Sequence, residues 1–380
     1  MDIKDLRKNI DEIDKKLTDL FAERMAVSAD IAEYKREKGR PVLDPVRERE
    51  KLSKIAEMTP EGLRDYSELL YSLIFELSRD YQTKTLGAGS ELTSKIEDAV
   101  ENTPKLFPEQ AFVACQGVAG SNSQFACDRL FRRASIMYFS SFEAVFKAIE
   151  KGLCRYGVIP VENSTAGSVN SVYDLMMSHK FSIVRSLRMK IEHCLLANPG
   201  TKLEDVKEIY SHEQAINQCS VFLSELTGVK VIPCENTAIA AKMVAESGRK
   251  DIAALASKQC MSFYGLASLK DSVQNTQNNY TRFICISKDL EIYPGADRTS
   301  VMLTLPHVPG SLYKLLARFY AVGVNINKLE SRPLPGKEFE FMFYFDFDTP
   351  VYSQRLLRLL GDLPGLCEQF SYLGSYSEVI

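Results

Sequence analysis

The chain has 380 residues and a mass of 42.8 kDa, with 45% hydrophobic and 26% charged residues. At roughly 100–200 residues per domain, this length predicts two or three globular domains, and the composition excludes a disordered or fibrous chain. The 47 basic and 50 acidic residues leave a net charge of −3, so no basic field predicts nucleic acid or an anionic membrane as a partner.

The sequence carries no sign of a membrane span, a leader peptide or a metal site. No apolar run approaches 20 residues, and the chain opens on charged residues, so we expect neither a membrane helix nor a signal peptide. Nine cysteines are scattered without a Cys-x-x-Cys pair, and four histidines lack metal-ligand spacing. These features predict reduced thiols in the cytoplasm, with no metal.

Residues 1–84 are dense in charge, and their few glycine and proline residues divide them into three helices. We expect these helices at about 3–38, 45–57 and 61–84. A helix of about 35 residues spans roughly 50 Å, which is too long for a compact monomer, so we expect a homodimer and leave a higher oligomer open. The first helix carries apolar residues in steps of three and four, which is the pattern of a coiled-coil-like seam. The members of this seam are Ile3, Leu6, Ile10, Ile13, Leu17, Leu20, Val27, Ile31 and Tyr34.

Arg24 occupies a seam position at which the spacing predicts an apolar residue. A cation at such a position is costly unless an anion meets it. Lys35 falls within about 20° of the same helix face, whereas Arg7 faces about 100° away and would reach the site only from a partner chain. These cations suit the binding of a small dianion and not covalent catalysis. A dimerisation bundle with solvated charges would give the same pattern, so the spacing alone leaves both interpretations open.

The rest of the chain divides into a linker and two further domains. Residues 85–110 combine Gly-Ala-Gly-Ser with acidic residues and prolines, and we interpret them as a linker. From residue 111 to about 290, short apolar runs alternate with helical stretches, which predicts an α/β domain. Its strands are expected at Ala111–Cys115, Tyr156–Val161, Ile252–Ala256 and Phe283–Ile286, and its helices at Ser141–Gly152, Gln214–Leu226 and Thr237–Ser247.

Residues 298–380 follow a turn-rich stretch and predict a ferredoxin-like module in the order strand, helix, strand, strand, helix, strand. The strands are expected at Ser300–Leu305, Asn325–Glu330, Phe341–Phe347 and Glu368–Leu373, and the helices at Ser311–Ala321 and Gln354–Leu360.

Polar motifs accompany the predicted strands of the α/β domain. The turn at Gly117–Ser123 suits either anion binding or an ordinary connection, and because it lacks the lysine of a phosphate loop we infer no nucleotide. Glu162, Asn163 and Ser164 follow a buried strand directly, at the edge that faces the ligand crevice in open α/β sheets. The other polar residues singled out in this domain are Ser211, Gln218 and Thr281, the last of which would ordinarily be a plain strand residue.

The N-terminal segment resembles the all-helical chorismate mutase family. The shared motifs are Leu6-Arg7, Ile10–Asp14, Ala22-Glu23-Arg24, Tyr34-Lys35, Arg40–Asp44 and Arg47–Glu50. The resemblance implies that Arg24, Arg47 and Arg7 of the partner chain bind the two carboxylates of chorismate. It also implies that Lys35 and Gln82 are catalytic and bind the ether oxygen. Asp44, Glu48 and Ser78 would hold the hydroxyl and order the cations.

The α/β domain resembles prephenate dehydratase through five motifs in order, which are the Gly-Ser loop, Glu162–Ser164, Tyr210–Cys219, Asn236–Ala241 and Thr281–Phe283. The resemblance implies two lobes, as in periplasmic binding proteins, with the site between them and no cofactor. Thr281 would donate a proton to the departing ring hydroxyl, and Arg282 is a candidate carboxylate anchor. The implied prephenate-binding set is Glu162, Asn163, Ser164, Ser211, Gln218, Thr281 and Arg282. Two residues, Asn122 and Glu213, depart from the family pattern and bear on the shape of the pocket.

The C-terminal module resembles the ACT regulatory domain, whose two motifs bind phenylalanine between paired domains. The matching residues are Pro309, Gly310, Ser311 and Leu312 in the first motif, and Glu330, Ser331, Arg332 and Pro333 in the second. The resemblance implies feedback inhibition by L-phenylalanine, with two distinct sites coupled through the protein.

Together these resemblances predict a bifunctional chorismate mutase–prephenate dehydratase of the cytoplasm, with chorismate and prephenate as substrates. Two alternatives stay open. The second domain could act on arogenate, or the chain could be a non-catalytic amino-acid sensor in which the helical segment only dimerises.

Overall fold

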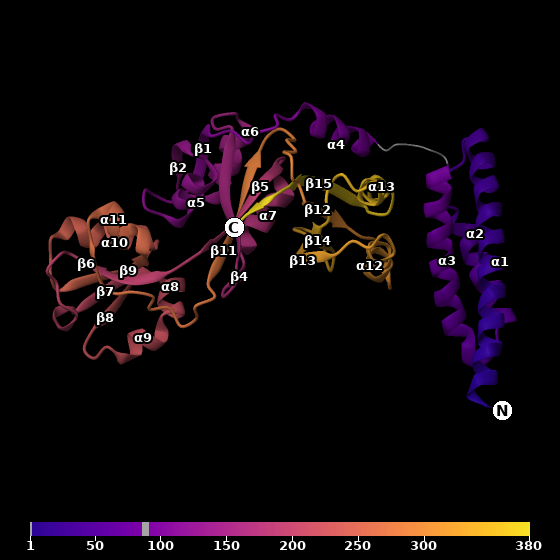
Figure 1. The fold of residues 1–380 in the computed structure, drawn as a ribbon, viewed down its shortest axis with the longest axis horizontal. Helices are drawn as coiled ribbons and strands as arrows, with labels where there is room; N and C mark the ends of the chain where they lie inside the picture. The colour runs from indigo at the N-terminus through magenta and orange to yellow at the C-terminus, as the bar shows by residue number, and fades with distance from the viewer. Residues whose placement is uncertain (1, 86–90) are drawn as a thin grey trace. The chain divides into compact units, whose positions relative to one another are not determined.

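The structure, a computed structural model of the chain, describes residues 2–85 and 91–380 (Figure 1). The chain divides into two compact units. The smaller comprises residues 1–95, 305–323 and 357–368, and the larger comprises residues 96–304, 324–356 and 369–380. The C-terminal domain expected from the sequence thus contributes residues to both units.

The N-terminal segment forms the three predicted helices. They are α1 (Ile3–Glu37), α2 (Pro45–Met58) and α3 (Arg64–Thr85), the last preceded by a 3₁₀ turn at Glu61–Leu63. Helix α2 begins at Pro45 because proline suits the first helical position and the Asp44 carboxylate caps it, accepting from the Arg47 backbone N–H at 3.0 Å. Both α1 and α2 pack against α3.

Helix α1 buries only a narrow face within the single chain. Its buried residues are Ser28 and Ala32, one turn apart. The apolar seam lies elsewhere on the helix, and Ile10, Leu17 and Leu20 are 56%, 57% and 62% exposed. A long apolar row exposed to water is unfavourable, so this face of α1 is costly to leave uncovered.

The predicted linker 85–110 contains a helix, α4 (Glu91–Asn102), whose Ile96 is fully buried. The chain after it is also anchored. Thr103 Oγ1 accepts from the Ile292 backbone N–H at 2.9 Å, and the Phe107 ring packs on that of Phe131 with centroids 5.1 Å apart. Only residues 86–90 of the expected linker lie outside the described residues.

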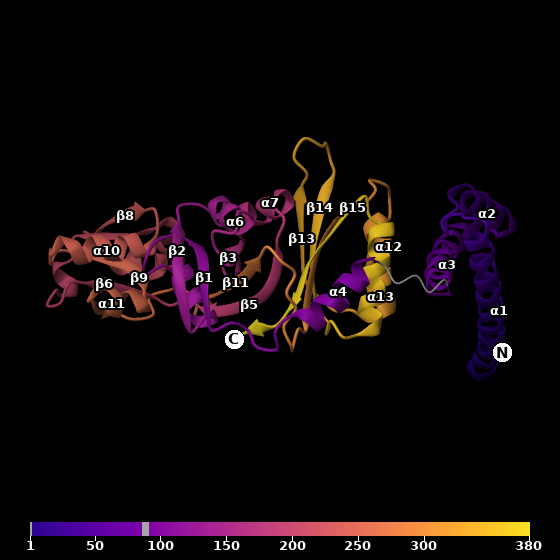
Figure 2. The ribbon, with the colours of Figure 1, turned by 90° about the horizontal axis from the view of Figure 1, so that it is seen from above.

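The α/β domain has two lobes, which both views separate (Figures 1 and 2). The first lobe is a mixed sheet in the order β16-β5-β11-β3-β1-β2, with the short β4 beside β3. Its strands are β1 (Gln110–Gln116), β2 (Arg133–Phe139), β3 (Tyr156–Asn163), β4 (Gly167–Ser168), β5 (Ser182–Lys190), β11 (Tyr280–Ser287) and β16 (Glu378–Val379). Its helices are α5 (Asn122–Leu130), α6 (Phe142–Glu150) and α7 (Asn170–Ser178).

The second lobe is a five-stranded sheet in the order β10-β6-β9-β7-β8. Its strands are β6 (His193–Ala197), β7 (Glu208–His212), β8 (Lys230–Cys234), β9 (Ile252–Ser257) and β10 (Ala267–Lys270). Its helices are α8 (Glu213–Gln218), α9 (Ser220–Glu225), α10 (Thr237–Ser247) and α11 (Lys258–Tyr264), with a 3₁₀ turn at Leu203–Asp205. The single helix expected at Gln214–Leu226 is therefore two short helices that meet at Cys219.

The C-terminal residues follow the predicted order of elements. An antiparallel sheet in the order β13-β14-β12-β15, which we call the C-terminal sheet, forms from four strands. They are β12 (Arg298–Thr304), β13 (Ile326–Pro333), β14 (Phe341–Asp348) and β15 (Gln369–Tyr376). The helices are α12 (Ser311–Val322) and α13 (Gln354–Asp362), followed by a 3₁₀ turn at Leu363–Gly365.

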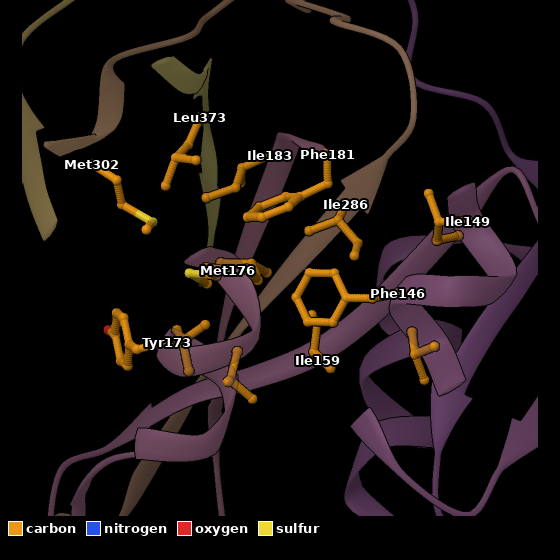
Figure 3. Close-up of a cluster of buried hydrophobic side chains, with 14 of the residues drawn as sticks. Phe146, Ile149, Ile159, Tyr173, Met176, Phe181, Ile183, Ile286, Met302 and Leu373 are labelled. Atoms are coloured by element: carbon orange, nitrogen blue, oxygen red, sulfur yellow. The ribbon is translucent and has the colours of Figure 1, made fainter. Parts of the chain in front are cut away.

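The C-terminal sheet shares a hydrophobic core with the first lobe. Met302 of β12 and Leu373 of β15 belong to the same buried cluster as Tyr173 and Met176 of α7 and Ile183 of β5 (Figure 3). Burying apolar side chains from both parts in one core ties the position of the C-terminal sheet to the strands of the first lobe.

Gly374→Ala should destabilise the larger unit. Gly374 has φ 137°, and a Cβ added there would lie 2.3 Å from the Ile183 carbonyl oxygen of β5. The close backbone approach leaves no room, so we expect a loss of about 2 kcal/mol or more in the free energy of unfolding. Gly365, with nothing within 4 Å of such a Cβ and no positive φ, supplies the control Gly365→Ala. Equal thermal midpoints for the two variants would contradict the tight packing.

Candidate active sites

Arg24 reaches α3 within the single chain. Its Nη1 donates to the Ser78 hydroxyl, and its guanidinium carbon lies 5.6 Å from the centre of the Phe75 ring. Burial lowers the pKa of Arg24, and in the described part of the chain no carboxylate pairs with it. A partly desolvated cation without an anionic partner is well prepared to bind an anionic ligand.

The two residues expected at the ether oxygen lie on α1 and α3. Lys35 Nζ donates to the Val42 carbonyl in the loop before α2. Gln82 is buried, and its Oε1 has no hydrogen-bond partner among the described residues. Because a buried acceptor without a partner is costly, Gln82 Oε1 is an atom that a donor group of a bound ligand could satisfy.

Helix α2 carries the other charged residues of the predicted mutase set. Asp44 caps the helix, and Glu48 accepts a hydrogen bond from Arg79 of α3. Arg47 is exposed, with Nη1 at 3.3 Å from Glu50 Oε2. Arg7 stands apart, because it precedes Arg24 by 17 residues, which is about 26 Å along the helix axis. Within one chain, the other predicted mutase residues lie on or next to three helices that pack together. Arg7 lies too far along α1 to join them.

Asn163 and Thr281 meet across neighbouring strands. Asn163 ends β3, and Thr281 lies opposite it on β11. Asn163 Nδ2 donates to Thr281 Oγ1 at 3.0 Å, and its Oδ1 accepts from two backbone N–H groups, those of Thr165 and Ala166, at 3.0 and 2.9 Å. Because the Thr281 oxygen accepts this hydrogen bond, its own hydrogen remains available, and the accepted bond makes the hydroxyl a better donor.

The same backbone groups fix the direction of a chain of side-chain hydrogen bonds. Since they can only donate, Asn163 Oδ1 must face them, and its Nδ2 donates to Asn279 Oδ1 at 2.7 Å. Asn279 Nδ2 then donates to Gln218 Oε1 at 3.1 Å, and His193 Nε2 lies 3.0 Å from the same oxygen. His193 must therefore carry its proton on Nε2.

His193 is held neutral by its surroundings. Burial lowers its pKa, and the hydrogen bond with Gln218 opposes that shift only in part. Its Nδ1 has no partner in the part of the chain that the structure describes, so a proton there would be an unpaired donor in the interior. Sequence reasoning missed His193 and did not assign a role to Asn279, because neither lies in a spacing pattern that marks a site.

A cavity of roughly 500 Å³ opens beside this network. Gln218 and Asn279 line it, together with His212 and Glu213 at the start of α8. Among the described residues that line the cavity, most carry amides or hydroxyls and Glu213 is the one carboxylate. The cavity therefore offers directional hydrogen bonds to a polar ligand.

The remaining predicted prephenate residues lie around this centre. Ser211 is fully buried and donates from Oγ to the Leu255 carbonyl at 2.6 Å. Ser164 Oγ donates to the Asn278 carbonyl at 2.8 Å and so holds the segment before β11 against the end of β3. Glu162 and Arg282 do not face the cavity; they pair with each other on the opposite side of the two strands.

The two predicted effector motifs lie in different units of the fold. Gly310 caps α12 with φ 83°, and Pro309, Ser311 and Leu312 flank it. In β13 the motif residues alternate, with Ser331 and Pro333 exposed. Glu330 Oε2 accepts from Ser168 Oγ at 2.5 Å, and Arg332 Nε lies 2.8 Å from Asp174 Oδ1, so these two side chains face the first lobe.

Within residues 2–85 and 91–380, no group of side chains is arranged to hold a metal ion. In the same residues no helix combines the length and apolarity that a membrane crossing needs.

Two known families match the two enzymatic segments. Residues 6–83 match chorismate mutase type II, and residues 113–291 match prephenate dehydratase. The bifunctional chorismate mutase/prephenate dehydratase of Enterobacter agglomerans is 31% identical over 98% of this chain and 95% of its own length. Arogenate dehydratase/prephenate dehydratase 1 of Arabidopsis thaliana is 36% identical over 80% of this chain and 79% of its own.

A solved structure matches the larger part of the fold. Prephenate dehydratase from Arthrobacter aurescens, determined in complex with L-Phe, is 27% identical with a TM-score of 0.64, over 70% of this chain and 89% of that one. The polypeptide thus joins a chorismate mutase to a prephenate dehydratase. It belongs to the family of bifunctional chorismate mutase/prephenate dehydratases, which convert chorismate to prephenate and prephenate to phenylpyruvate.

His193→Gln should remove one source of acid sensitivity. The unfolded chain protonates His193 below about pH 6.5, whereas the folded protein resists protonation because its pKa is lowered. Wild-type stability should therefore fall as pH drops below that value, by up to about 1.4 kcal/mol per pH unit from this residue. The glutamine side chain would keep a donor near the position of Nε2 and cannot titrate. The free energy of unfolding measured in urea should therefore become larger for the variant than for the wild type as the pH falls from about 7.5 to about 5.5. A constant difference would contradict a neutral, buried His193.

Proposed function

We propose that the two reactions use the residues assigned by resemblance, and that two copies of the chain build each mutase site. The observation that carries the dehydratase assignment is the hydrogen bond from Asn163 to Thr281, which leaves the threonine hydroxyl free to donate. The observation that carries the mutase assignment is the partly desolvated Arg24 beside Ser78, with no carboxylate partner among the described residues.

In the mutase site, chorismate is held with its reacting ends close together. Arg24 and Arg47 bind the carboxylates with Arg7 of a second copy, and Asp44, Glu48 and Ser78 hold the hydroxyl and order the cations. Lys35 and Gln82 donate to the ether oxygen, on which negative charge develops as its C–O bond breaks. Positioning and electrostatic stabilisation supply the rate enhancement, since the rearrangement needs no nucleophile.

The exposed seam of α1 supports the dimer. A second copy would cover Ile10, Leu17, Leu20 and their neighbours, and it would bring its own Arg7 toward the Arg24 end of the helix if the two helices run antiparallel. The length of α1 is then explained, because each helix spans from one site to the other.

In the dehydratase site, prephenate loses carbon dioxide and water. The electron pair of the breaking C–CO₂ bond enters the ring, and the ring hydroxyl leaves as water as it takes a proton from Thr281, which then regains a proton from solvent. Asn163 orders that hydroxyl and Gln218 binds the substrate. The buried Ser211, which resemblance assigns to substrate binding, acts indirectly by holding the end of β7 through its bond to Leu255. Ser164 holds the end of β3, and Glu162 and Arg282 support the two strands. A hydroxyl is a weak acid in bulk water, so the ordered network around it is what makes this transfer effective.

L-Phenylalanine is the proposed feedback inhibitor. Both motifs of the C-terminal domain support this, as does the L-Phe bound to the related dehydratase from Arthrobacter aurescens. Gly310, with its positive φ and nothing within 4 Å of a Cβ position, leaves the backbone open to a ligand. The nine cysteines are all free thiols, which supports a reducing compartment and hence the cytoplasm.

Arogenate is a second candidate substrate of the dehydratase domain. It differs from prephenate in carrying an ammonium group, and Glu213 provides a carboxylate on the cavity wall. The Arabidopsis relative is also named for both reactions. Turnover of arogenate and prephenate by one preparation decides between them, and a larger kcat/KM for arogenate would establish it as the preferred substrate.

The pair Arg7→Ala and Arg24→Ala tests the shared mutase site. Each variant alone should lack mutase activity, because every site in its dimer lacks one arginine. After mixing with subunit exchange, half the dimers are mixed and one of their two sites is intact, so about a quarter of wild-type mutase activity should return. Dehydratase activity serves as the internal control. No recovery in dimers shown to have exchanged would contradict a site built by two chains.

Purified protein given chorismate alone should form phenylpyruvate, and L-phenylalanine should suppress it. Product identification by chromatography distinguishes the parts of the proposal. Accumulation of prephenate would keep the mutase but contradict the dehydratase assignment. No turnover of either chorismate or prephenate would instead support a non-catalytic sensor.

A further inference from the structure

Strands β3 and β11 carry a second polar pair on the face opposite to the active-site pair. Thr281 lies opposite Asn163, and Arg282 lies opposite Glu162. Since successive residues of a strand point to opposite faces, Glu162 and Arg282 turn away from the cavity. The register shifts immediately afterwards, between Arg282 and Phe283, and such bulges bend a strand and re-aim its side chains. Both pairs therefore depend on the same short stretch of backbone.

Arg282 joins this backbone to the C-terminal sheet. Its Nη1 donates to the carboxylate of Asp346 on β14 and lies 3.4 Å from Glu162 Oε1, and its Nη2 donates to the Tyr376 hydroxyl of β15 at 2.9 Å. Arg282, Asp346 and Tyr376 are all buried. The Asp346 carboxylate also accepts from Tyr344 at 2.6 Å, so this end of the network is firmly held.

Lys328 joins the other end of the network to β13. Its Nζ lies 3.1 Å from Glu162 Oε2, 3.4 Å from Glu330 Oε2 and 2.8 Å from Ser168 Oγ. Ser168 belongs to β4, where it pairs in register with Glu162. Glu330 is part of one predicted effector motif, so a single lysine links that motif to the residue next to Asn163.

We propose that Glu162 is a positioning residue through which β13 controls the hydrogen bond between Asn163 and Thr281. The proposal rests on the proposed function, because it takes L-phenylalanine as the ligand that acts on β13. Displacement of β13 moves Lys328, and Glu162 must then follow it or lose one of its two cations. Either response alters the backbone that also positions Asn163, while the buried Arg282–Asp346 pair keeps the neighbouring strand in place.

The test is the variant Lys328→Met, compared with Lys328→Arg and with the control Lys337→Met. Lys337 lies between β13 and β14 and pairs with Glu340 at 2.6 Å. Saturating L-phenylalanine should lower kcat/KM for prephenate about tenfold in the wild type and in the control, but less than about twofold in Lys328→Met. Calorimetry should show that Lys328→Met still binds L-phenylalanine within about threefold of the wild-type Kd, and Lys328→Arg should restore inhibition.

Each of the other possible results would contradict a specific part of this proposal. Full inhibition of Lys328→Met by L-phenylalanine would overturn the coupling alone. Loss of L-phenylalanine binding in that variant would make Lys328 an effector ligand and also overturn the coupling. A wild-type protein that L-phenylalanine neither binds nor inhibits would overturn the effector assignment and the coupling together. If Lys328→Met fails to fold, Glu162→Gln serves instead, since it removes the negative charge that pairs with Lys328; unchanged inhibition in it would overturn the proposal.

Discussion

The dehydratase half of the molecule depends on the antiparallel pairing of β3 with β11. That pairing sets Asn163 beside Thr281 on one face and Glu162 beside Arg282 on the other. The two faces have different surroundings. Asn163 is hydrogen-bonded to Asn279, which lines a cavity rich in amides, whereas Arg282 is buried and pairs with Asp346 of the C-terminal sheet. If the proposed roles hold, chemistry and control share four residues on two strands, because a displacement of one pair acts on the backbone that carries the other.

The two enzymatic domains each contain a buried or partly buried arginine, and the two arginines have different surroundings. In the helical domain, Arg24 is partly buried with no carboxylate beside it among the described residues, so in the proposed mutase site the ligand would supply the missing anion. In the α/β domain, the buried Arg282 is already neutralised by Asp346 and Glu162. Arg282 also lies 3.6 Å from Glu378 Oε1. An arginine without a carboxylate partner suits binding, and an arginine with three suits a structural role, because an extra anion would have to displace an existing pair.

The sequence predicted the elements whose periodicity is strong. The heptad-like spacing of α1 and the proline at the start of α2 predict the ends of both helices to within one residue of the observed ends. The order of strands and helices in the C-terminal domain also follows the expected pattern. Helix α4 was missed because the glycine, serine and proline residues around it dominate its short apolar period. Strand β2 was missed because its exposed faces include Arg133 and Met137, which gives no buried apolar run.

Only part of the candidate dehydratase site could be predicted from the sequence, because only some of its residues lie in motifs. Motifs identified Asn163, Gln218 and Thr281, and the fold joins them through hydrogen bonds. His193 and Asn279 enter only through tertiary contacts, since each lies where the chain crosses between lobes. Which way Arg282 faces could not be predicted either, because a strand residue's side is set by register and by the bulge beside it.

The most direct test of the account is the rate of phenylpyruvate formation by Thr281→Val beside Thr281→Ser. Valine keeps the shape of threonine but cannot donate a proton, whereas serine can. We expect Thr281→Val to lose dehydratase activity by about 100-fold or more while prephenate accumulates from chorismate at the wild-type rate, and Thr281→Ser to retain most of its activity. A rate in Thr281→Val within about tenfold of that in Thr281→Ser would contradict a proton transfer from Thr281.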